Sequence, residues 1–311
     1  MKIFLASIIL LSLLFPVNSI KAQDTVRISF DEENFVEYAV FDKITDKEKD
    51  ESYLNYYLKQ RKEGKDPFAV LYSVSPRLSG DIQIFACKTK VNAENARILF
   101  DKNEFNNPFS FSSEKDGREL DADKTVENIF SGLDKGGKFV IKPVYNPISP
   151  TVTIKQAEEK VKKLSTFSTT YKTSSLNRCK NLELAAERIN GVVLKPGEIF
   201  SFNQATKQRT EENGYFPATV IVNGEYVEGM GGGVCQVSTT LFNAVKKARL
   251  SVTERYVHTL PPSYVEQGAD ATVSESMDFK FKNDTDEPLY IIALTRDKTL
   301  TVTLYGKEIK K

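Results

Sequence analysis

The sequence predicts an α+β protein whose helices pack against antiparallel sheets. Strand-like segments with alternating apolar residues and helix-like segments follow one another in mixed order, which is typical of this class. The last part of the chain gives the clearest evidence. Three strand-like segments, 277–282, 289–294 and 300–305, follow one another there and are joined by short turns, which favours antiparallel neighbours.

The overall composition is that of a folded protein with room for two domains. Of the 311 residues, 40% are hydrophobic and 27% are charged, which argues against a disordered chain. The formal net charge is +1, so neither a nucleic acid nor an anionic membrane surface is expected as a partner.

Residues 1–22 are predicted to be a secretory signal peptide. Lys2 supplies the positive start, 3–17 is a nearly continuous apolar run, and small residues follow, with cleavage expected after Ser19 or Ala22. The run is too short for a membrane span, and no other stretch is apolar enough to cross a bilayer. The mature chain is therefore expected outside the cytoplasm, associated with the cell envelope, without a membrane span.

Residues 23–107 are expected to form an N-terminal α+β region of unknown role. The predicted elements are a strand at 26–30, a helix within 44–64, strands at 68–74 and 82–89, and a short helix at 91–100. The charged run from Lys47 to Lys65 is interpreted as a solvated face, so this region carries no chemistry that the sequence can name.

Residues 108–161 are predicted to form a small α+β module. The expected elements are a hairpin turn at Asp116-Gly117, a helix to Leu133 capped by Asp121 or Asp123, a strand at 139–144, a proline-containing connector at 145–150 and a helix from Thr151 that includes Leu164.

Residues 162–311 are predicted to form the domain that carries the site. Before the three final strands, the expected elements are a helix at 181–190, a strand from Val192, a strand holding Phe200 and Phe202 on one face, a hairpin around Asn223-Gly224, a helix from Cys235 to Arg249 and a strand at 251–260.

The stretch 230–249 organises this domain. Gly231, Gly232 and Gly233 lead directly into Cys235, after which apolar residues recur with helical spacing. A helix N-terminus lowers the pKa of a thiol, and glycines leave backbone N–H groups accessible as an oxyanion hole. Gln236 is a further candidate donor to an oxyanion.

Two later residues complete a candidate catalytic set. His258 is the one histidine in the chain and lies in the predicted strand 251–260, and Asp270 lies at the mouth of the next strand. A cysteine nucleophile needs an imidazole as its base, and the imidazole needs a carboxylate or amide to fix its tautomer. Cys235, His258 and Asp270 are therefore the candidate nucleophile, base and orienting residue.

Each of these residues also has a structural interpretation. A cysteine at a helix start commonly behaves as a small hydrophobic side chain, and a single histidine or a turn aspartate commonly serves the fold. Metal binding is disfavoured, because Cys235, His258 and Asp270 lack the ligand spacing of zinc sites. We expect no metal and no cofactor.

The three cysteines make an odd number for an exported protein. A disulfide between Cys87 and Cys179 leaves Cys235 free, as a nucleophile must be. The alternative is three isolated, reduced thiols.

The motifs of the last region resemble those of the VanW family over roughly 181–306. The matching motifs are Glu187-Arg188, Asn190-Gly191, Pro196-Gly197-Glu198, Phe200-Ser201-Phe202-Asn203, Arg209-Thr210, Gly214-Tyr215, Gly231-Gly232-Gly233-Val234-Cys235-Gln236-Val237-Ser238-Thr239-Thr240-Leu241, Glu254-Arg255, His258, and Gly268 with Asp270-Ala271-Thr272-Val273. Within them, Ser238, Arg209 and Arg255 are expected to support the site. A weaker resemblance links 108–161 to a peptidoglycan-binding-like module, through Pro108-Phe109 and 117–121.

The resemblance implies an exported bacterial protein connected with vancomycin resistance and the cell wall, although the family name defines no reaction. The order of cysteine helix, histidine strand and aspartate strand is also similar to papain-like and transglutaminase-like folds. That order predicts attack of Cys235 on an amide or ester carbonyl of a peptidoglycan peptide stem. Water as acceptor gives an amidase or peptidase, and an amine gives a transpeptidase.

The competing hypothesis is a protein that binds wall polymer or a muropeptide without turning it over. Cys235 and His258 are then structural or vestigial. One observation distinguishes the two hypotheses. The enzyme requires the Cys235 sulfur to lie within hydrogen-bond reach of a His258 ring nitrogen in an open cleft, whereas the binding protein does not.

Overall fold

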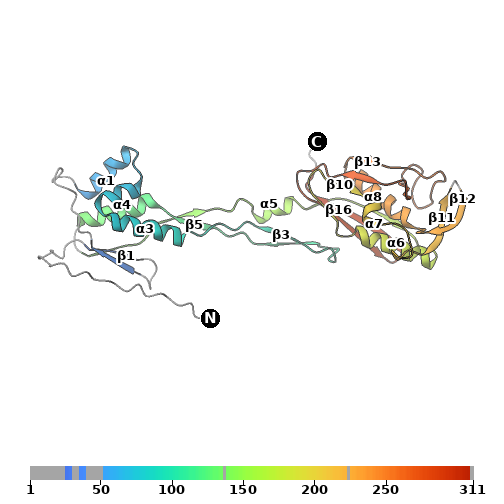
Figure 1. The fold of residues 1–311 in the computed structure, drawn as a ribbon, viewed down its shortest axis with the longest axis horizontal. Helices are drawn as coiled ribbons and strands as arrows, with labels where there is room; N and C mark the ends of the chain where they lie inside the picture. Colours follow the sequence, from blue (N-terminus) through green and yellow to red (C-terminus); the bar gives the residue numbers. More distant parts are fainter. Residues whose placement is uncertain (1–24, 30–34, 40–51, 136–137, 223–224, 309–311) are drawn as a thin grey trace. The chain divides into compact units, whose positions relative to one another are not determined.

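The computed structural model describes residues 25–29, 35–39, 52–135, 138–222 and 225–308 (Figure 1). The predicted signal peptide lies outside these residues. The described chain forms two compact units, one from the residues up to Glu94 with Asp116–Ser149, the other from Asn95–Lys115 with the residues from Pro150 onward. Helices pack with mainly antiparallel strands in both, which confirms the α+β class. The domain boundaries predicted at 107/108 and 161/162 concern modules of the sequence and stay predictions.

Unit 1 combines a small sheet with four helices. Its strands are β1 (Thr25–Ser29), β2 (Phe35–Ala39) and β6 (Phe139–Ile141) in the order β2-β1-β6, and the separate pair β5 (Gly117–Leu120) with β7 (Tyr145–Ile148). Its helices are α1 (Tyr53–Lys62), α2 (Pro67–Val74), α3 (Pro76–Thr89) and α4 (Ala122–Lys135). The β1–β6 pair is parallel and the others are antiparallel.

Two predicted strands of this unit are helices, because capping residues decide the outcome. Asp66 accepts hydrogen bonds from the N–H groups of Phe68 and Ala69, and Pro67 occupies the first helical position of α2. Ser75 and Pro76 start α3 in the same way. The predictions of strands at 68–74 and 82–89 are therefore wrong. The strand at 26–30 is confirmed as β1 within its described residues, and Asp121 caps α4 through the N–H of Lys124 at 2.9 Å.

Unit 2 contains two sheets, two hairpin-like ribbons and four helices. The larger sheet has the order β8 (Lys162–Thr170), β16 (Thr299–Gly306), β15 (Leu289–Arg296) and β9 (Val193–Leu194). The smaller has the order β10 (Ile199–Ser201), β14 (Lys280–Lys282) and β13 (Val252–Glu254). The ribbons are β3 (Arg97–Phe100) with β4 (Phe109–Ser112), and β11 (Pro217–Val222) with β12 (Glu225–Met230); the helices are α5 (Ile154–Glu159), α6 (Leu176–Ile189), α7 (Phe202–Thr206) and α8 (Val234–Lys247).

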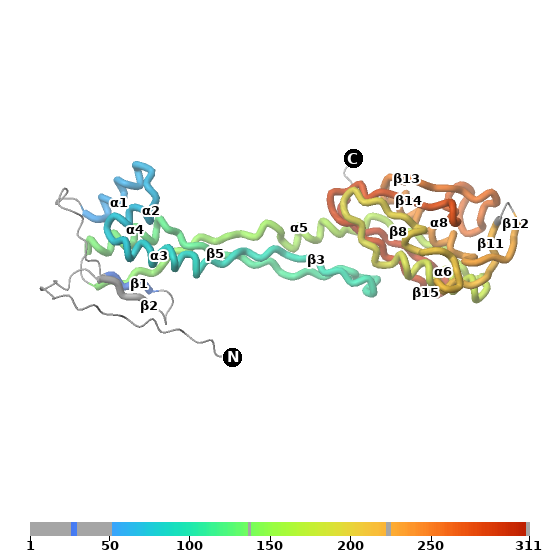
Figure 2. Tube along the Cα trace, in the orientation of Figure 1, coloured from blue at the N-terminus to red at the C-terminus, as the bar shows by residue number. Residues whose placement is uncertain are grey.

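Helix α8 is the centre of unit 2. It packs against β8, β16 and α6 (Figure 2). The ring of Phe242 contacts that of Phe279, the residue before β14, edge to face with 5.8 Å between the ring centroids. Val237, Leu241 and Ala244 on the predicted apolar stripe are fully buried. The polar face is buried as well, and its side chains bond to backbone carbonyls, as when Thr240 donates to Gln236 at 2.6 Å. The helix is therefore a core helix, buried on its polar face as well as on the predicted apolar stripe.

Several predicted elements of the later chain differ in length or type. The helix predicted from Thr151 ends at Glu159, because the segment that holds Leu164 joins the large sheet as β8. The predicted helix at 91–100 is wrong, since its second half is β3. The turn at Asp116-Gly117 closes no hairpin: β4 pairs with β3, and β5 pairs with β7. The predicted connector 145–150 contains β7, and Phe202 opens α7 after β10. The helix predicted at 181–190 is the later part of α6, and the hairpin around 223–224 and the strands at 289–294 and 300–305 are confirmed. The strand predicted at 277–282 is shorter, because only 280–282 pair, as β14, and they do so in the smaller sheet.

Candidate active site

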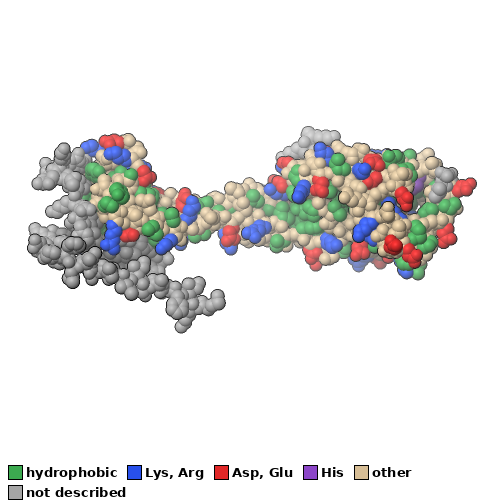
Figure 3. Space-filling view, in the orientation of Figure 1, with side chains coloured by type: hydrophobic (Ala, Val, Ile, Leu, Met, Phe, Trp, Pro, Cys, Tyr) green, Lys and Arg blue, Asp and Glu red, His purple; other side chains and the backbone are tan. Residues whose placement is uncertain are grey.

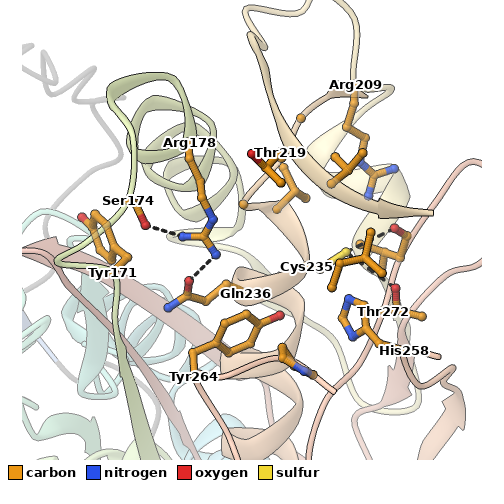
Figure 4. Close-up of a pocket in the computed structure, with 18 of the residues that line it drawn as sticks. Tyr171, Ser174, Arg178, Arg209, Thr219, Cys235, Gln236, His258, Tyr264 and Thr272 are labelled. Atoms are coloured by element: carbon orange, nitrogen blue, oxygen red, sulfur yellow. Dashed lines mark hydrogen bonds between the residues drawn. The ribbon is translucent and has the colours of Figure 1, made fainter. Parts of the chain in front are cut away.

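A cavity of about 800 Å³ opens at the N-terminal end of α8. Its walls come from α6, the β11–β12 hairpin, the start of α8 and the loops that carry His258, Tyr264 and Thr272 (Figure 4). The purple patch in Figure 3 is the single histidine, and it is visible from outside in unit 2. Cys235 and His258 both line this cavity, so the two predicted residues meet at a surface that a ligand can reach.

The glycines before α8 are required by close packing. A Cβ at Gly232 would lie 2.4 Å from the carbonyl oxygen of Thr219 in β11. Gly233 has φ +109°, and a Cβ there would lie 2.9 Å from the carbonyl oxygen of Arg178. The helix therefore starts in a tight corner between α6 and the β11–β12 hairpin, and this corner fixes Cys235 at the cavity wall. Among the described residues, no hydrogen bond is found from the N–H groups of Gly232 and Gly233.

Asp270 holds His258 by two hydrogen bonds. Its Oδ2 accepts from the ring Nδ1 of His258 at 2.6 Å and from the backbone N–H of the same residue at 2.7 Å. The side chains of both residues are almost fully buried. The predicted strand 251–260 ends at Glu254, so His258 lies in a loop, and the aspartate positions the ring where strand pairing was expected to do so.

The Cys235 thiol and the His258 ring line the same cavity, and each shifts the pKa of the other. Burial raises the pKa of Cys235, but the interactions with His258 and with the backbone of Val273 outweigh it, so the pKa lies below the ordinary value. Burial lowers the pKa of His258, and the interactions with Cys235 and Asp270 outweigh it, so that pKa is raised. These opposite shifts favour a thiolate–imidazolium pair.

Two of the predicted supporting residues brace the Asp270 loop. Arg255 donates to the backbone carbonyls of Asp270 at 2.8 Å and Gly268 at 2.6 Å. Ser238 donates to the carbonyl of Ala271 at 2.5 Å and to that of Cys235 at 3.0 Å. Ser238 thus ties the loop of the aspartate to the helix of the cysteine.

Gln236 faces away from the position of an oxyanion donor. Its amide nitrogen donates to Thr169 Oγ1 at 3.0 Å and to the Thr170 carbonyl at 2.9 Å, which uses both of its N–H groups. Its oxygen accepts from Arg178 at 2.8 Å. As the residues are arranged here, the amide positions Arg178 and has no N–H group left to donate to an oxyanion.

Arg209 reaches the cavity beside Cys235 (Figure 4). It donates to Asn203 Oδ1 at 2.6 Å, and its side chain lies so close to Gly231 that a Cβ there would be 2.7 Å from Arg209 Cγ. Burial lowers its pKa, while Tyr215, Cys235, Asp278 and Glu275 act in the opposite direction.

Sequence analysis missed three residues of the cavity wall: Arg178, Tyr264 and Thr272. Arg178 lies in the first turn of α6, where a cation opposes the helix dipole, and that unfavourable placement was the available signal. Thr272 lies 3.7 Å from the Cys235 sulfur and belongs to a quoted motif, but no spacing singled it out. Tyr264 follows Pro261-Pro262 in a loop without periodicity.

All three cysteines are free, with Cys87 exposed and Cys179 buried. The Cys87–Cys179 disulfide considered from the sequence is absent. Over the part of the chain that the structure describes, no group of three or more His, Cys, Asp or Glu is placed to hold a metal ion. Within the same residues, no helix has the length and apolar character needed to cross a membrane.

Two curated proteins share this part of the sequence. The chain is 44% identical over 147 residues to the uncharacterized protein YoaR of Bacillus subtilis, covering 47% of this chain and 48% of that protein. It is 37% identical over 116 residues to the vancomycin B-type resistance protein VanW of Enterococcus faecalis, covering 35% of this chain and 42% of that protein. The chain therefore spans about half the length of these relatives or less.

The matched segment coincides with the domain around the cavity. Residues 177–305 match the family model described as VanW like protein, a range that includes α6, α8, His258 and Asp270. No solved structure matches the chain, so the likeness in chain order to papain-like and transglutaminase-like enzymes stays a prediction. Residues 177–305 therefore form a domain that is similar to the VanW family.

Proposed function

We propose that this chain is an exported cell-envelope enzyme in which Cys235 transfers an acyl group of a peptidoglycan peptide stem. The observation that carries the proposal is that Cys235 and His258 line one open cavity, where the ring of His258 is hydrogen-bonded to Asp270. The relative whose name assigns it to vancomycin resistance supports a role at the cell wall. The predicted signal at 1–22 supports export.

The proposed reaction begins with attack of the Cys235 thiolate on an amide carbonyl of the stem. The carbonyl electrons move onto oxygen, and the N–H groups of Gly232 and Gly233 are the candidate donors to that oxyanion. The tetrahedral intermediate collapses, the C–N bond breaks, and His258 gives its proton to the leaving amine. A thioester on Cys235 and a free amine result.

His258, now neutral, then takes a proton from the acceptor. Water gives a carboxylic acid, and an amine gives a new amide; in either case the C–S bond breaks and the thiolate–imidazolium pair is restored. Asp270 fixes the ring by its bond to Nδ1, which leaves Nε2 for the thiol and the substrate.

A second function has its own supporting observation. The Cys235 sulfur donates to the Val273 carbonyl at 3.4 Å and lies near the Thr272 hydroxyl, contacts that suit a structural thiol. A protein that binds wall polymer or a muropeptide without turnover is compatible with the same cavity.

The first experiment is site-resolved alkylation of Cys235 with iodoacetamide across pH, in wild type and in His258→Ala. Exposed Cys87 in the same sample serves as an internal reference for reagent and pH. We expect wild-type Cys235 to react at lower pH than an ordinary thiol. In His258→Ala the burial that raises the Cys235 pKa stands unopposed by the imidazole, so the midpoint should move above the ordinary value.

Turnover separates the two functions. Peptide stems are then incubated with wild type and with Cys235→Ser, and products are read by mass spectrometry. Loss of stem cleavage or exchange in Cys235→Ser supports the enzyme. A Cys235 titration that is indifferent to His258, with no change in any stem, refutes it and leaves the binding function.

A further inference from the structure

Arg178 is a cation inside the cavity with only neutral hydrogen-bond partners. Its two terminal nitrogens donate to Ser174 Oγ at 2.6 Å and to Gln236 Oε1 at 2.8 Å, as the dashed lines in Figure 4 mark. In the described ranges no carboxylate lies within ion-pair distance of its guanidinium. An arginine has five N–H donors, so this one keeps donors available for a ligand.

The placement of Arg178 is costly for the fold. Burial lowers its pKa, and the groups that act in the opposite direction, Tyr264, Cys179 and Cys235, are a phenol and two thiols and include no carboxylate. It also lies in the first turn of the 14-residue helix α6, where the helix dipole disfavours a cation. A half-buried guanidinium without a carboxylate partner is expected where a ligand supplies the carboxylate.

A buried network holds the guanidinium in place. Gln236 is 1% exposed, and its nitrogen must donate to the Thr170 carbonyl, so its oxygen is directed at Arg178. Thr169, which accepts the second N–H of the amide, is itself bonded to Thr240 at 2.8 Å. Gln236 follows Cys235 directly in α8, so the same helix turn that presents the nucleophile also fixes Arg178.

Arg209 differs from Arg178 in its surroundings. The carboxylates of Asp278 and Glu275 act on its charge, whereas no carboxylate is among the groups that act on Arg178. Figure 4 shows Arg209 on the Cys235 side of the cavity and Arg178 on the side of Gln236 and Tyr264. A ligand that reaches Arg178 therefore extends along the cavity away from the thiol.

We infer that Arg178, positioned by Gln236 and Ser174, is a specificity-determining residue that binds a carboxylate of the acyl substrate at a distance from the attacked carbonyl. A planar guanidinium matches a carboxylate through paired hydrogen bonds, which a lysine cannot reproduce. The inference rests on the proposed function, because it takes Cys235 as the reacting group. The substrate class is an acidic peptide, either with a free C-terminal carboxylate or with an acidic side chain.

The test uses thiol reagents in matched pairs. N-iodoacetyl derivatives of glycine, β-alanine and γ-aminobutyrate each carry a carboxylate at increasing distance from the reacting carbon, and the corresponding amides are the neutral partners. Site-resolved rates at Cys235, divided by those at exposed Cys87, give the carboxylate-over-amide ratio for each length. Because both members of a pair meet the same thiol, the ratio is independent of how strongly His258 activates it.

We expect the wild-type ratio to exceed that of Cys87 and to peak at one length. Arg178→Gln should lower the peak by about tenfold, the effect of one charge-assisted hydrogen-bonded pair. Arg178→Lys should restore only part of it, and Ser174→Ala should lower it less. Lys180→Gln removes a charge from an exposed position of the same helix and should leave the ratio unchanged.

A wild-type ratio that never exceeds that of Cys87 overturns the inference, whatever the variants do. An Arg178→Gln ratio equal to wild type at every length does the same. Either result leaves the proposed function standing if Cys235 still titrates at low pH and depends on His258. If Cys235 titrates like an ordinary thiol but the carboxylate-over-amide ratio still depends on Arg178, the proposed enzyme is refuted. The cavity then remains a site that binds anions. Peptides with a free or amidated C-terminus, with and without an acidic side chain, then identify the source of the carboxylate.

Discussion

One oxygen of Asp270 accepts two hydrogen bonds from the same residue, His258: the ring Nδ1–H at 2.6 Å and the backbone N–H at 2.7 Å. The loop and the ring are thus fixed by a single carboxylate. Because an acidic loop residue controls both, a small change there alters the imidazole without touching the thiol.

Replacing Asp270 by asparagine should lower the fraction of Cys235 that is present as thiolate at neutral pH. The amide oxygen can keep a hydrogen bond, but the negative charge that helps to raise the His258 pKa is lost. We expect the alkylation rate of Cys235 near neutral pH to fall about tenfold, equivalent to one pKa unit. Site-resolved mass spectrometry measures it, with Cys87 as reference. An unchanged rate would show that the aspartate serves only the loop.

The glycines of unit 1 predict opposite effects of the same substitution. In α3, a Cβ at Gly80 would meet nothing within 4 Å, so Gly80→Ala should stabilise the unit by about 1 kcal/mol. In α4, a Cβ at Gly132 would lie 2.0 Å from the Phe139 ring, so Gly132→Ala should destabilise it. Hydrogen exchange of the core amides of unit 1 gives both free energies. If both substitutions changed the free energy of unfolding in the same direction, the packing described around Gly80 and Gly132 would be contradicted.

The free energy of unfolding of unit 1 should also depend on pH and should fall in acid. Arg61 donates to both carboxylate oxygens of Asp123, at 2.5 and 2.9 Å, and this interaction, with the Tyr57 hydroxyl, holds the Asp123 pKa below its ordinary value. A lowered folded-state pKa contributes stability above the unfolded pKa, and that contribution is lost as the pH falls through the folded pKa.

The measurement compares the free energy of unfolding of wild type and Asp123→Asn across pH. The difference should be level at neutral pH and shrink in acid. It should stay within about 1 kcal/mol, because the carboxylate is 55% exposed and solvent screens the pair. A difference that grows in acid would contradict the assignment.

The sequence predicted which of the candidate site residues lie close together better than it predicted the elements that carry them. Gly231–Gly233, Cys235, His258 and Asp270 have unusual residue types or motifs that are visible without the fold. Their meeting depends on the loop bond of Asp270 to His258, which no periodicity reveals, so the strand predicted for His258 was too long. Arg178 was missed for the same reason, since only the cavity shows that its partners are neutral.

The wrong predictions have a common physical origin. In α2 and α3 the apolar runs are short, and short runs are ambiguous between strand and helix. Asp66-Pro67 and Ser75-Pro76 decide for the helix, and they are local signals that the sequence contained. In β8 the alternation is weak, and pairing with β16 determines the strand, so only the tertiary fold could supply it.

The tight corner before α8 should tolerate no side chain. In Gly232→Ala the new Cβ meets the Thr219 carbonyl oxygen, which belongs to paired backbone, so we expect a loss of about 2 kcal/mol in unit 2. Gly197→Ala is the contrasting control, because its φ of +78° strains a side chain, which Gly232 does not share, and its Cβ meets nothing within 4 Å. That control should cost about 1 kcal/mol. Hydrogen exchange of α8 measures both, and equal losses would refute the packing explanation for Gly232.

Replacing Thr272 by valine tests the thiol's second neighbour. The Thr272 hydroxyl lies 3.7 Å from the Cys235 sulfur and helps to lower the thiol pKa, but its effect is smaller than that of His258. Valine keeps nearly the same shape at this buried position, so the fold should persist. The pH midpoint of Cys235 alkylation should rise in Thr272→Val, though by less than in His258→Ala, because a hydroxyl donor stabilises the thiolate without carrying a charge. A rise equal to that in His258→Ala would mean that the hydroxyl, and not the imidazole, controls the thiol, and the base in the proposed reaction would have to be reassigned.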